Sequence, residues 1–251
     1  LDFMFDLKGI NFYLFGLVSN SDGIMWPIME ELLMNRKFLG QLKIVHQDFI
    51  EMGLEAAEAI KLATEAFENH DLELANKVIE HDEVINNLEI KLEKKTSQLI
   101  ALQQPVATNL RKVIAILKAS SDVERIGDHA VDVAKAVRNI NVKRRNVEIE
   151  SLIREVSEQT QENLVKIVSM FAKFDEKGAV EIAKKNQEKR EKINEIRKLS
   201  INAIKEDANF AEEGIDYLSI IAHIKRINDY ITNLAEWIVY EEEGKITELT
   251  F

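Results

Sequence analysis

The strongest constraint on the fold is an apolar pattern that occurs twice, with the two copies 101 residues apart. The first copy consists of Val123, Ile126, Ala130, Val133, Ala134 and Val137, and the second of Ile224, Ile227, Ile231, Leu234, Ala235 and Ile238. Within each copy the residues recur at three- and four-residue steps, as the buried stripe of a helix does. A duplicated buried helix predicts that the chain folds as two related units.

Composition indicates that helices also make up the rest of the chain. The 251 residues include only 9 Gly and 2 Pro, against 31% charged residues, whereas turn-rich β architectures need more Gly and Pro. The hydrophobic fraction of 46% is enough for a sizeable core in a chain of this length. We therefore predict an all-α fold.

From Phe38 onward, apolar-periodic stretches alternate with short polar breaks, which predicts six long antiparallel helices. In the first half we expect helices at about 38–68, 71–102 and 105–139, with Asp71 as a helix cap and Pro105 in a first turn. In the second half we expect them at about 148–174, 179–205 and 213–240. A basic stretch at 141–146 separates the halves. The expected architecture is two tandem, pseudo-symmetric three-helix bundles at 34–140 and 141–251.

Residues 1–33 do not follow this pattern and are interpreted as an N-terminal extension. They contain three glycines, Pro27 and several aromatic residues, and they lack a sustained helical period. The residues at 30–33 could be a purine-rich ribosome-binding sequence read in frame, which leads to the hypothesis that translation starts at Met34. The alternatives are an expressed arm that packs on the bundle and a cloning remnant.

Several classes of function are excluded or disfavoured by composition. The absence of Cys excludes disulfides, thiolate catalysis and Cys-ligated metal sites. A net charge of −11 disfavours binding to nucleic acid and to anionic membrane surfaces. The longest apolar run, at 10–18, is about half of a membrane span, so neither membrane insertion nor export is expected. Protein partners and cations are the expected ligands.

Two related motifs resemble those of the PhoU family of phosphate transport system regulatory proteins. The first is Ser121-Asp122-Val123-Glu124-Arg125-Ile126-Gly127-Asp128-His129-Ala130, preceded by Gln103-Gln104-Pro105-Val106-Ala107. The second is Arg226-Ile227-Asn228-Asp229-Tyr230, followed by Asn233-Leu234-Ala235-Glu236-Trp237. The resemblance extends over about residues 35–243 and leaves the N-terminal extension outside.

The resemblance implies a function that the composition alone does not. It implies a cytoplasmic, non-enzymatic adaptor between the ATPase subunit of the phosphate ABC transporter, of the PstB type, and a PhoR-type sensor histidine kinase. Such a protein restrains phosphate uptake and phosphate-starvation signalling when phosphate is plentiful. The family also implies a homodimer.

Glu124, Asp128 and Asp132 recur at four-residue steps, so they form an acidic ridge along one side of the third expected helix. The apolar stripe lies nearly opposite, so the ridge should face solvent or a ligand. The resemblance implies that Glu-x-x-x-Asp motifs of this kind bind iron or zinc clusters, with Glu124 and Asp128 as the matched ligands. Asp122 and Asp132 are further candidates. The competing interpretation is a solvated acidic face paired with Arg125 and Lys135.

The second copy keeps only one of the four acidic positions. Adding 101 to Asp122, Glu124, Asp128 and Asp132 leads to His223, Lys225, Asp229 and Asn233. An ammonium at Lys225 repels a cation, so two equivalent metal sites are not expected, although Asp229 with His223 could form a weaker one. Ligands without thiols also suit magnesium, manganese or calcium.

The alternative function is a metal-binding helical bundle with a storage or enzymatic role. A ferritin-like di-iron enzyme would place Glu-x-x-His pairs in the bundle interior, but none of the five His residues follows a Glu at that spacing. The sequence also lacks a Gly-rich phosphate loop and a zincin motif. We therefore expect no enzymatic activity.

Overall fold

The computed structural model describes residues 5–7, 10–12, 25–140, 144–173 and 175–249, with side chains from Arg36 onward. Contacts divide the chain into two units, Leu1–Gly40 and Gln41–Phe251. In the first unit, strands β1 (Phe5–Leu7) and β2 (Ile10–Phe12) pair antiparallel, with Asp6 opposite Asn11. The remaining described residues of that unit belong to the start of the first helix.

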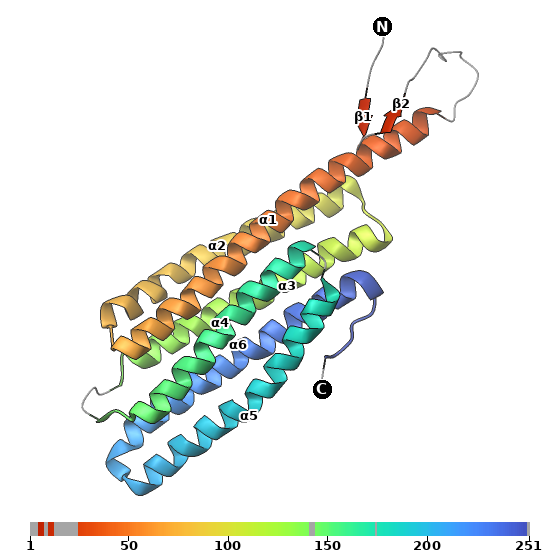
Figure 1. Ribbon diagram of the computed structural model, residues 1–251. Helices are drawn as coiled ribbons and strands as arrows, with labels where there is room; N and C mark the ends of the chain where they lie inside the picture. Colours follow the sequence, from red (N-terminus) through yellow and green to blue (C-terminus); the bar gives the residue numbers. More distant parts are fainter. Residues whose placement is uncertain (1–4, 8–9, 13–24, 141–143, 174, 250–251) are drawn as a thin grey trace. The chain divides into compact units, whose positions relative to one another are not determined.

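Six long helices follow in the described chain (Figure 1). They are α1 (Met25–Asn69), α2 (Leu72–Gln103), α3 (Ala107–Val137), α4 (Val147–Lys173), α5 (Glu176–Glu206) and α6 (Ala211–Glu243), with the 3-10 turn η2 (Ala208–Phe210) before α6. From Gln41 onward the architecture is the predicted all-α tandem bundle, α1–α3 followed by α4–α6. None of the described helices has an apolar stretch long enough to cross a membrane.

The second unit is built around α3 and α6, which lie side by side. Helix α2 packs on α3, whereas α4 and α5 pack on α6 and on each other. All twelve residues of the two predicted apolar stripes are buried, so the duplicated pattern is confirmed as the centre of the core. Aromatic side chains fill the space around it, with the rings of Phe49 and Phe171 4.7 Å apart between α1 and α4.

Local capping signals explain where α2 and α5 start. The Asp71 side chain accepts a hydrogen bond from the backbone N–H of Leu74 over 2.9 Å, as the capping prediction requires. Pro105 is not in the first turn of α3, because Gln104 ends α2 in a left-handed conformation and Val106 is still extended. Helix α5 starts at Glu176 rather than Ala179, because Asp175 caps it by accepting from the N–H of Gly178.

The predicted start of the first helix near Phe38 is wrong, because α1 begins at Met25. Pro27 lies in its first turn, where the missing N–H costs nothing, and strong helix formers follow it. Met34 therefore lies within α1, and a translation start at this residue stays a prediction. Residues 1–4, 8–9 and 13–24 of the extension, and 141–143 of the linker, lie outside the described residues.

Candidate functional site: an acidic cluster on two helices

Glu124 and Asp128 lie together on the α3 face next to α2, where two further carboxylates approach them. Asp128, Glu89 and Asp82 all act electrostatically on Glu124, and Asp82 also acts on Asp128. We call Asp82, Glu89, Glu124 and Asp128 the acidic cluster. It consists of two carboxylates from each helix of an antiparallel pair.

The carboxylates of the acidic cluster are close enough to repel one another when they are ionised. Partial burial, followed by repulsion from Asp128, Glu89 and Asp82, raises the pKa of Glu124 to about 7. The pKa of Asp128 is raised by burial, Asp82 and Asp132. The Oδ1 atom of Asp82 is buried and has no hydrogen-bond partner among the described residues, whereas Oδ2 accepts from Asn86 over 3.1 Å.

Of the two cations that were expected to neutralise the ridge, Lys135 pairs with the ridge residue Asp132, whereas Arg125 lies over an aromatic ring of α6. Arg125 lies over the ring of Tyr230, 5.8 Å from its centroid, and Lys135 binds Asp132 over 3.0 Å. Within the described part of the chain, no salt bridge joins Lys or Arg to a member of the acidic cluster. Arg125 lowers the pKa of Glu124, and His129 and Lys135 lower that of Asp128, but burial and the neighbouring carboxylates outweigh these cations. The cluster therefore presents carboxylate oxygens without a salt bridge to Lys or Arg, the donor set that hard cations prefer.

The other three predicted ligands lie outside the acidic cluster, and they are Asp132, Asp122 and Asp229. Asp132 lies beside His129 and His223, whose pKa values are lowered mainly by burial. Asp122 is only 7% exposed and accepts a hydrogen bond from Trp237, so it belongs to the contact between α3 and α6.

Asp229 forms ion pairs with two cations, Lys225 at 2.7 Å and Arg190 at 3.4 Å. A metal at Asp229 would have to displace both. Of the five predicted ligands, the structure thus brings Glu124 and Asp128 into one cluster and leaves Asp229 in the second bundle.

Asp82 and Glu89 were not among the predicted ligands, although the sequence contains a signal for them. Helices α2 and α3 form an antiparallel pair that reverses at residues 104–106, so positions equally distant from this turn become neighbours. Asp82 and Asp128 are each 23 residues from Pro105, whereas Glu89 and Glu124 are 16 and 19 residues from it, within one helical turn of each other. The turn position combined with acid spacing on both helices would have indicated the complete cluster.

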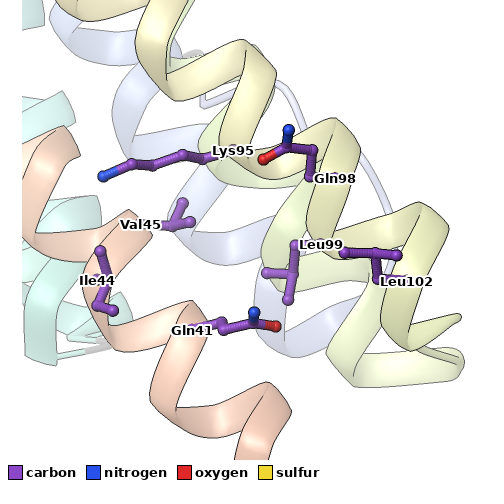
Figure 2. Close-up of a pocket in the computed structure, with 7 residues that line it drawn as sticks. All are labelled: Gln41, Ile44, Val45, Lys95, Gln98, Leu99 and Leu102. Carbon is purple, nitrogen blue, oxygen red and sulfur yellow. The ribbon is translucent and has the colours of Figure 1, made fainter.

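A shallow groove between α1 and α2 contains no cluster of ionisable side chains like the acidic cluster (Figure 2). Its volume of about 180 Å³ is below that of ordinary small-molecule sites, and its lining is mainly apolar. The lining residues are Gln41, Ile44, Val45, Lys95, Gln98, Leu99 and Leu102. The Lys95 ammonium is paired with Asp48, so the groove contains no free nucleophile or base from which a catalytic site could be built.

Comparison with known proteins finds a family match in each of the two bundles. The family described as PhoU domain matches residues 49–137 and 153–238, one segment in each bundle. The chain belongs to the PhoU domain family. The "Phosphate-specific transport system accessory protein PhoU homolog" of Streptococcus pneumoniae serotype 4 is 31% identical, over 86% of this chain and 100% of that protein. The homolog of the same description from Clostridium acetobutylicum is 29% identical, over 86% and 99%.

Solved structures of the family share the architecture. The phosphate transport system regulatory protein PhoU from Streptococcus pneumoniae superposes with a TM-score of 0.79 at 30% identity, over 84% of this chain and 99% of that chain. PhoU from Pseudomonas aeruginosa gives a TM-score of 0.79 at 25% identity, over 83% and 100%. The resemblance noted in the two motifs is thus confirmed over both PhoU domains.

Proposed function

We propose that this PhoU-family chain is an accessory regulator of phosphate transport that restrains phosphate uptake and phosphate-starvation signalling. The observation that carries the proposal is the pair of PhoU domain matches, 49–137 and 153–238, with one match in each bundle. Relatives that are matched over nearly their whole length are described as accessory proteins of the phosphate-specific transport system. The proposal transfers that role to this chain.

The partners in this proposal are a PstB-type transporter ATPase and a PhoR-type sensor histidine kinase. Both act at the cytoplasmic side of the membrane, so we place the protein in the cytoplasm, with a homodimer as its assembly. The role is that of an adaptor rather than an enzyme. The helical surfaces would supply the contacts, because the groove between α1 and α2 is too small for a typical substrate.

The acidic cluster would bind metal ions in support of this role. Four carboxylates on two helices, with a buried and unpaired oxygen on Asp82, fit a multidentate oxygen site. Iron or zinc is the family expectation, and magnesium, manganese and calcium are compatible with the same donors. A bound cation would offset the repulsion between α2 and α3 and hold this face of the first bundle in one conformation for its partner.

The test is affinity purification of the full chain from phosphate-replete cells, with mass spectrometry of bound proteins and elemental analysis of bound metals. We expect the transporter ATPase or the sensor kinase to be recovered. Capture of neither protein, together with unchanged phosphate regulation in a deletion strain, would overturn the regulatory role. Metal recovered without either partner would favour the alternative, a metal-storage or enzymatic bundle.

A pair of matched variants tests the metal part separately. Glu124→Gln with Asp128→Asn should abolish metal retention by the acidic cluster. Glu158→Gln with Glu162→Gln is the control, because these exposed carboxylates have the same four-residue spacing on α4 but pair with Arg154 and Lys166. Equal metal content in both double variants would contradict the cluster as a metal site.

A further inference from the structure

Two histidines from different bundles face each other where α3 packs on α6. The Nδ1 atoms of His129 and His223 are 3.1 Å apart. The Oδ2 atom of Asp132 lies 3.7 Å from Nδ1 of His223 and 4.0 Å from Nδ1 of His129. Three atoms that can bind metal, two nitrogens and one oxygen, thus converge from two helices.

These separations match the dimensions of a transition-metal site. The point equidistant from three atoms that are 3.1, 3.7 and 4.0 Å apart lies about 2.1 Å from each of them. That distance is the usual length of Zn–N and Zn–O bonds in proteins. A metal at this point needs no change in the helix positions.

We infer that His129, Asp132 and His223 form a metal site of the zinc class that joins the two PhoU domains, with water in the remaining coordination position. Two imidazoles and one carboxylate suit Zn²⁺ and its neighbours in the first transition series better than Mg²⁺ or Ca²⁺, which prefer oxygen ligands. The site is therefore distinct in chemistry from the acidic cluster, and the inference does not depend on the proposed regulatory role.

The orientation of the carboxylate favours a cation over a simple pair of hydrogen-bonded histidines. A neutral pair uses one N–H and one lone pair between the rings, and Oδ2 of Asp132 is then too far from either Nδ1 for a good hydrogen bond. A metal satisfies all three atoms at once. The other oxygen of Asp132, Oδ1, accepts from Lys135 over 3.0 Å, which holds Oδ2 towards the imidazoles.

Neighbouring groups also keep the rings in position. The His129 ring stacks on Tyr230 with centroids 5.7 Å apart and an angle of 25° between the planes. The side chains of His129 and His223 are 21% and 25% exposed, so the site is shielded by protein yet reachable from solvent. Because both helices are packed along the centre of the unit, the ligands are preorganised.

The duplication of the chain shows that this site has no second copy. His223 corresponds, by the 101-residue offset, to Asp122, which is buried and bonded to Trp237. His129 corresponds to Tyr230, which cannot replace an imidazole as a zinc ligand of ordinary affinity. One zinc-class ion per chain is the expected stoichiometry at this site.

The experiment is a titration of the purified, chelator-treated full chain with Zn²⁺ by calorimetry, and with Co²⁺ by visible absorption. It uses the Glu124→Gln, Asp128→Asn background, so that the acidic cluster does not compete. We expect one equivalent to bind and Co²⁺ to give the absorption bands of nitrogen and oxygen ligation. His223→Ala and Asp132→Asn should each weaken binding by more than the roughly 10- to 100-fold that loss of an outer-shell partner costs.

The matched control is His81→Ala, because His81 is also a half-exposed histidine beside a carboxylate, Glu55, at 2.7 Å. It should leave Zn²⁺ binding unchanged, and Zn²⁺ should raise the melting temperature of this control but not that of His223→Ala. Failure of the background protein to bind Zn²⁺ would overturn the inference. Equal affinity in His223→Ala, Asp132→Asn and the control would overturn it as well.

Discussion

Nε1 of Trp237 donates a hydrogen bond to Oδ2 of Asp122 over 2.9 Å, and this bond joins the second bundle to the first. Asn233 approaches the other oxygen of the same carboxylate at 3.5 Å. The pKa of Asp122 is nevertheless raised, because burial outweighs these donors. Asp122 is thus a structural acceptor between α3 and α6, whereas Glu124 and Asp128 lie near the carboxylates of α2.

We expect Asp122→Ala to destabilise the protein by about 1–3 kcal/mol, because it leaves the partly buried indole N–H without an acceptor. Asp122→Asn should cost less, since an amide oxygen still accepts. Urea unfolding measures both effects, and elemental analysis should find metal content unchanged in the Asn variant. Loss of metal from a folded Asp122→Asn protein would show that this residue is a ligand after all.

The periodic pattern predicted the core, because a buried helical stripe depends only on local repetition along the chain, but it did not predict that Asp122 is buried beside that stripe. It could not show that Trp237 lies opposite, because that pairing depends on how α6 packs against α3. The same limit applies to the acidic cluster. Glu124 and Asp128 were predicted from their spacing on one helix, whereas Asp82 and Glu89 belong to the cluster only because α2 folds back along α3.

Gly53 allows α1 to approach α4 closely. A Cβ at this position would lie 2.5 Å from Cγ2 and 3.0 Å from Cγ1 of Val168, a side chain with little freedom to move. We expect Gly53→Ala to destabilise by about 1–3 kcal/mol through overpacking, despite the better helix propensity of Ala. Adding Val168→Ala should recover part of the loss in chemical denaturation.

The control for this effect is Gly40→Ala, because a Cβ at Gly40 has no heavy atom within 4 Å. There the propensity gain of roughly 0.5–1 kcal/mol should appear without a steric cost. If Gly53→Ala proved as stable as Gly40→Ala, the close approach of α1 to α4 would be wrong.

Lys189 is buried in the second bundle with only 7% of its surface exposed. Its ammonium donates to the carbonyl of Gln159 at 3.1 Å and to the side-chain oxygens of Asn186 and Asn228, each at 3.2 Å. Burial lowers its pKa from 10.5 to about 7, with a smaller contribution from Lys166 and an opposing one from Glu162. The unfolded chain therefore holds a proton that the native protein loses between these two pH values.

The free energy of unfolding should consequently rise as pH increases from about 7 towards 10, by at most ~1.4 kcal/mol per pH unit. Below pH 7 both the native and the unfolded state carry the proton, and the cost of burying the charge is present in full.

The Lys189→Met variant lacks this pH dependence, so the stability of the wild type relative to the variant should increase between pH 6.5 and 9.5. Lys185→Met, which alters an exposed lysine on the same helix, should leave the slope intact. A slope that Lys189→Met does not reduce would contradict the lowered pKa.

Glu124 should make the stability of the metal-free protein depend on pH in the opposite direction. Its pKa is raised from 4.5 to about 7, so the native state holds a proton that the unfolded chain has lost in this interval. Stability therefore falls as pH rises from 4.5 through 7, because the ionised group is partly buried and must also face the other carboxylates of the cluster. In chelator, Glu124→Gln should melt at a higher temperature than the wild type at pH 8, with little difference at pH 4.5.

Saturation with metal should reverse the order of the melting temperatures at pH 8, since the cation binds the carboxylate and not the amide. Glu158→Gln serves as the control on an exposed surface. If Glu124→Gln melted below the wild type in chelator at pH 8, the repulsion between the carboxylates of the acidic cluster would be refuted.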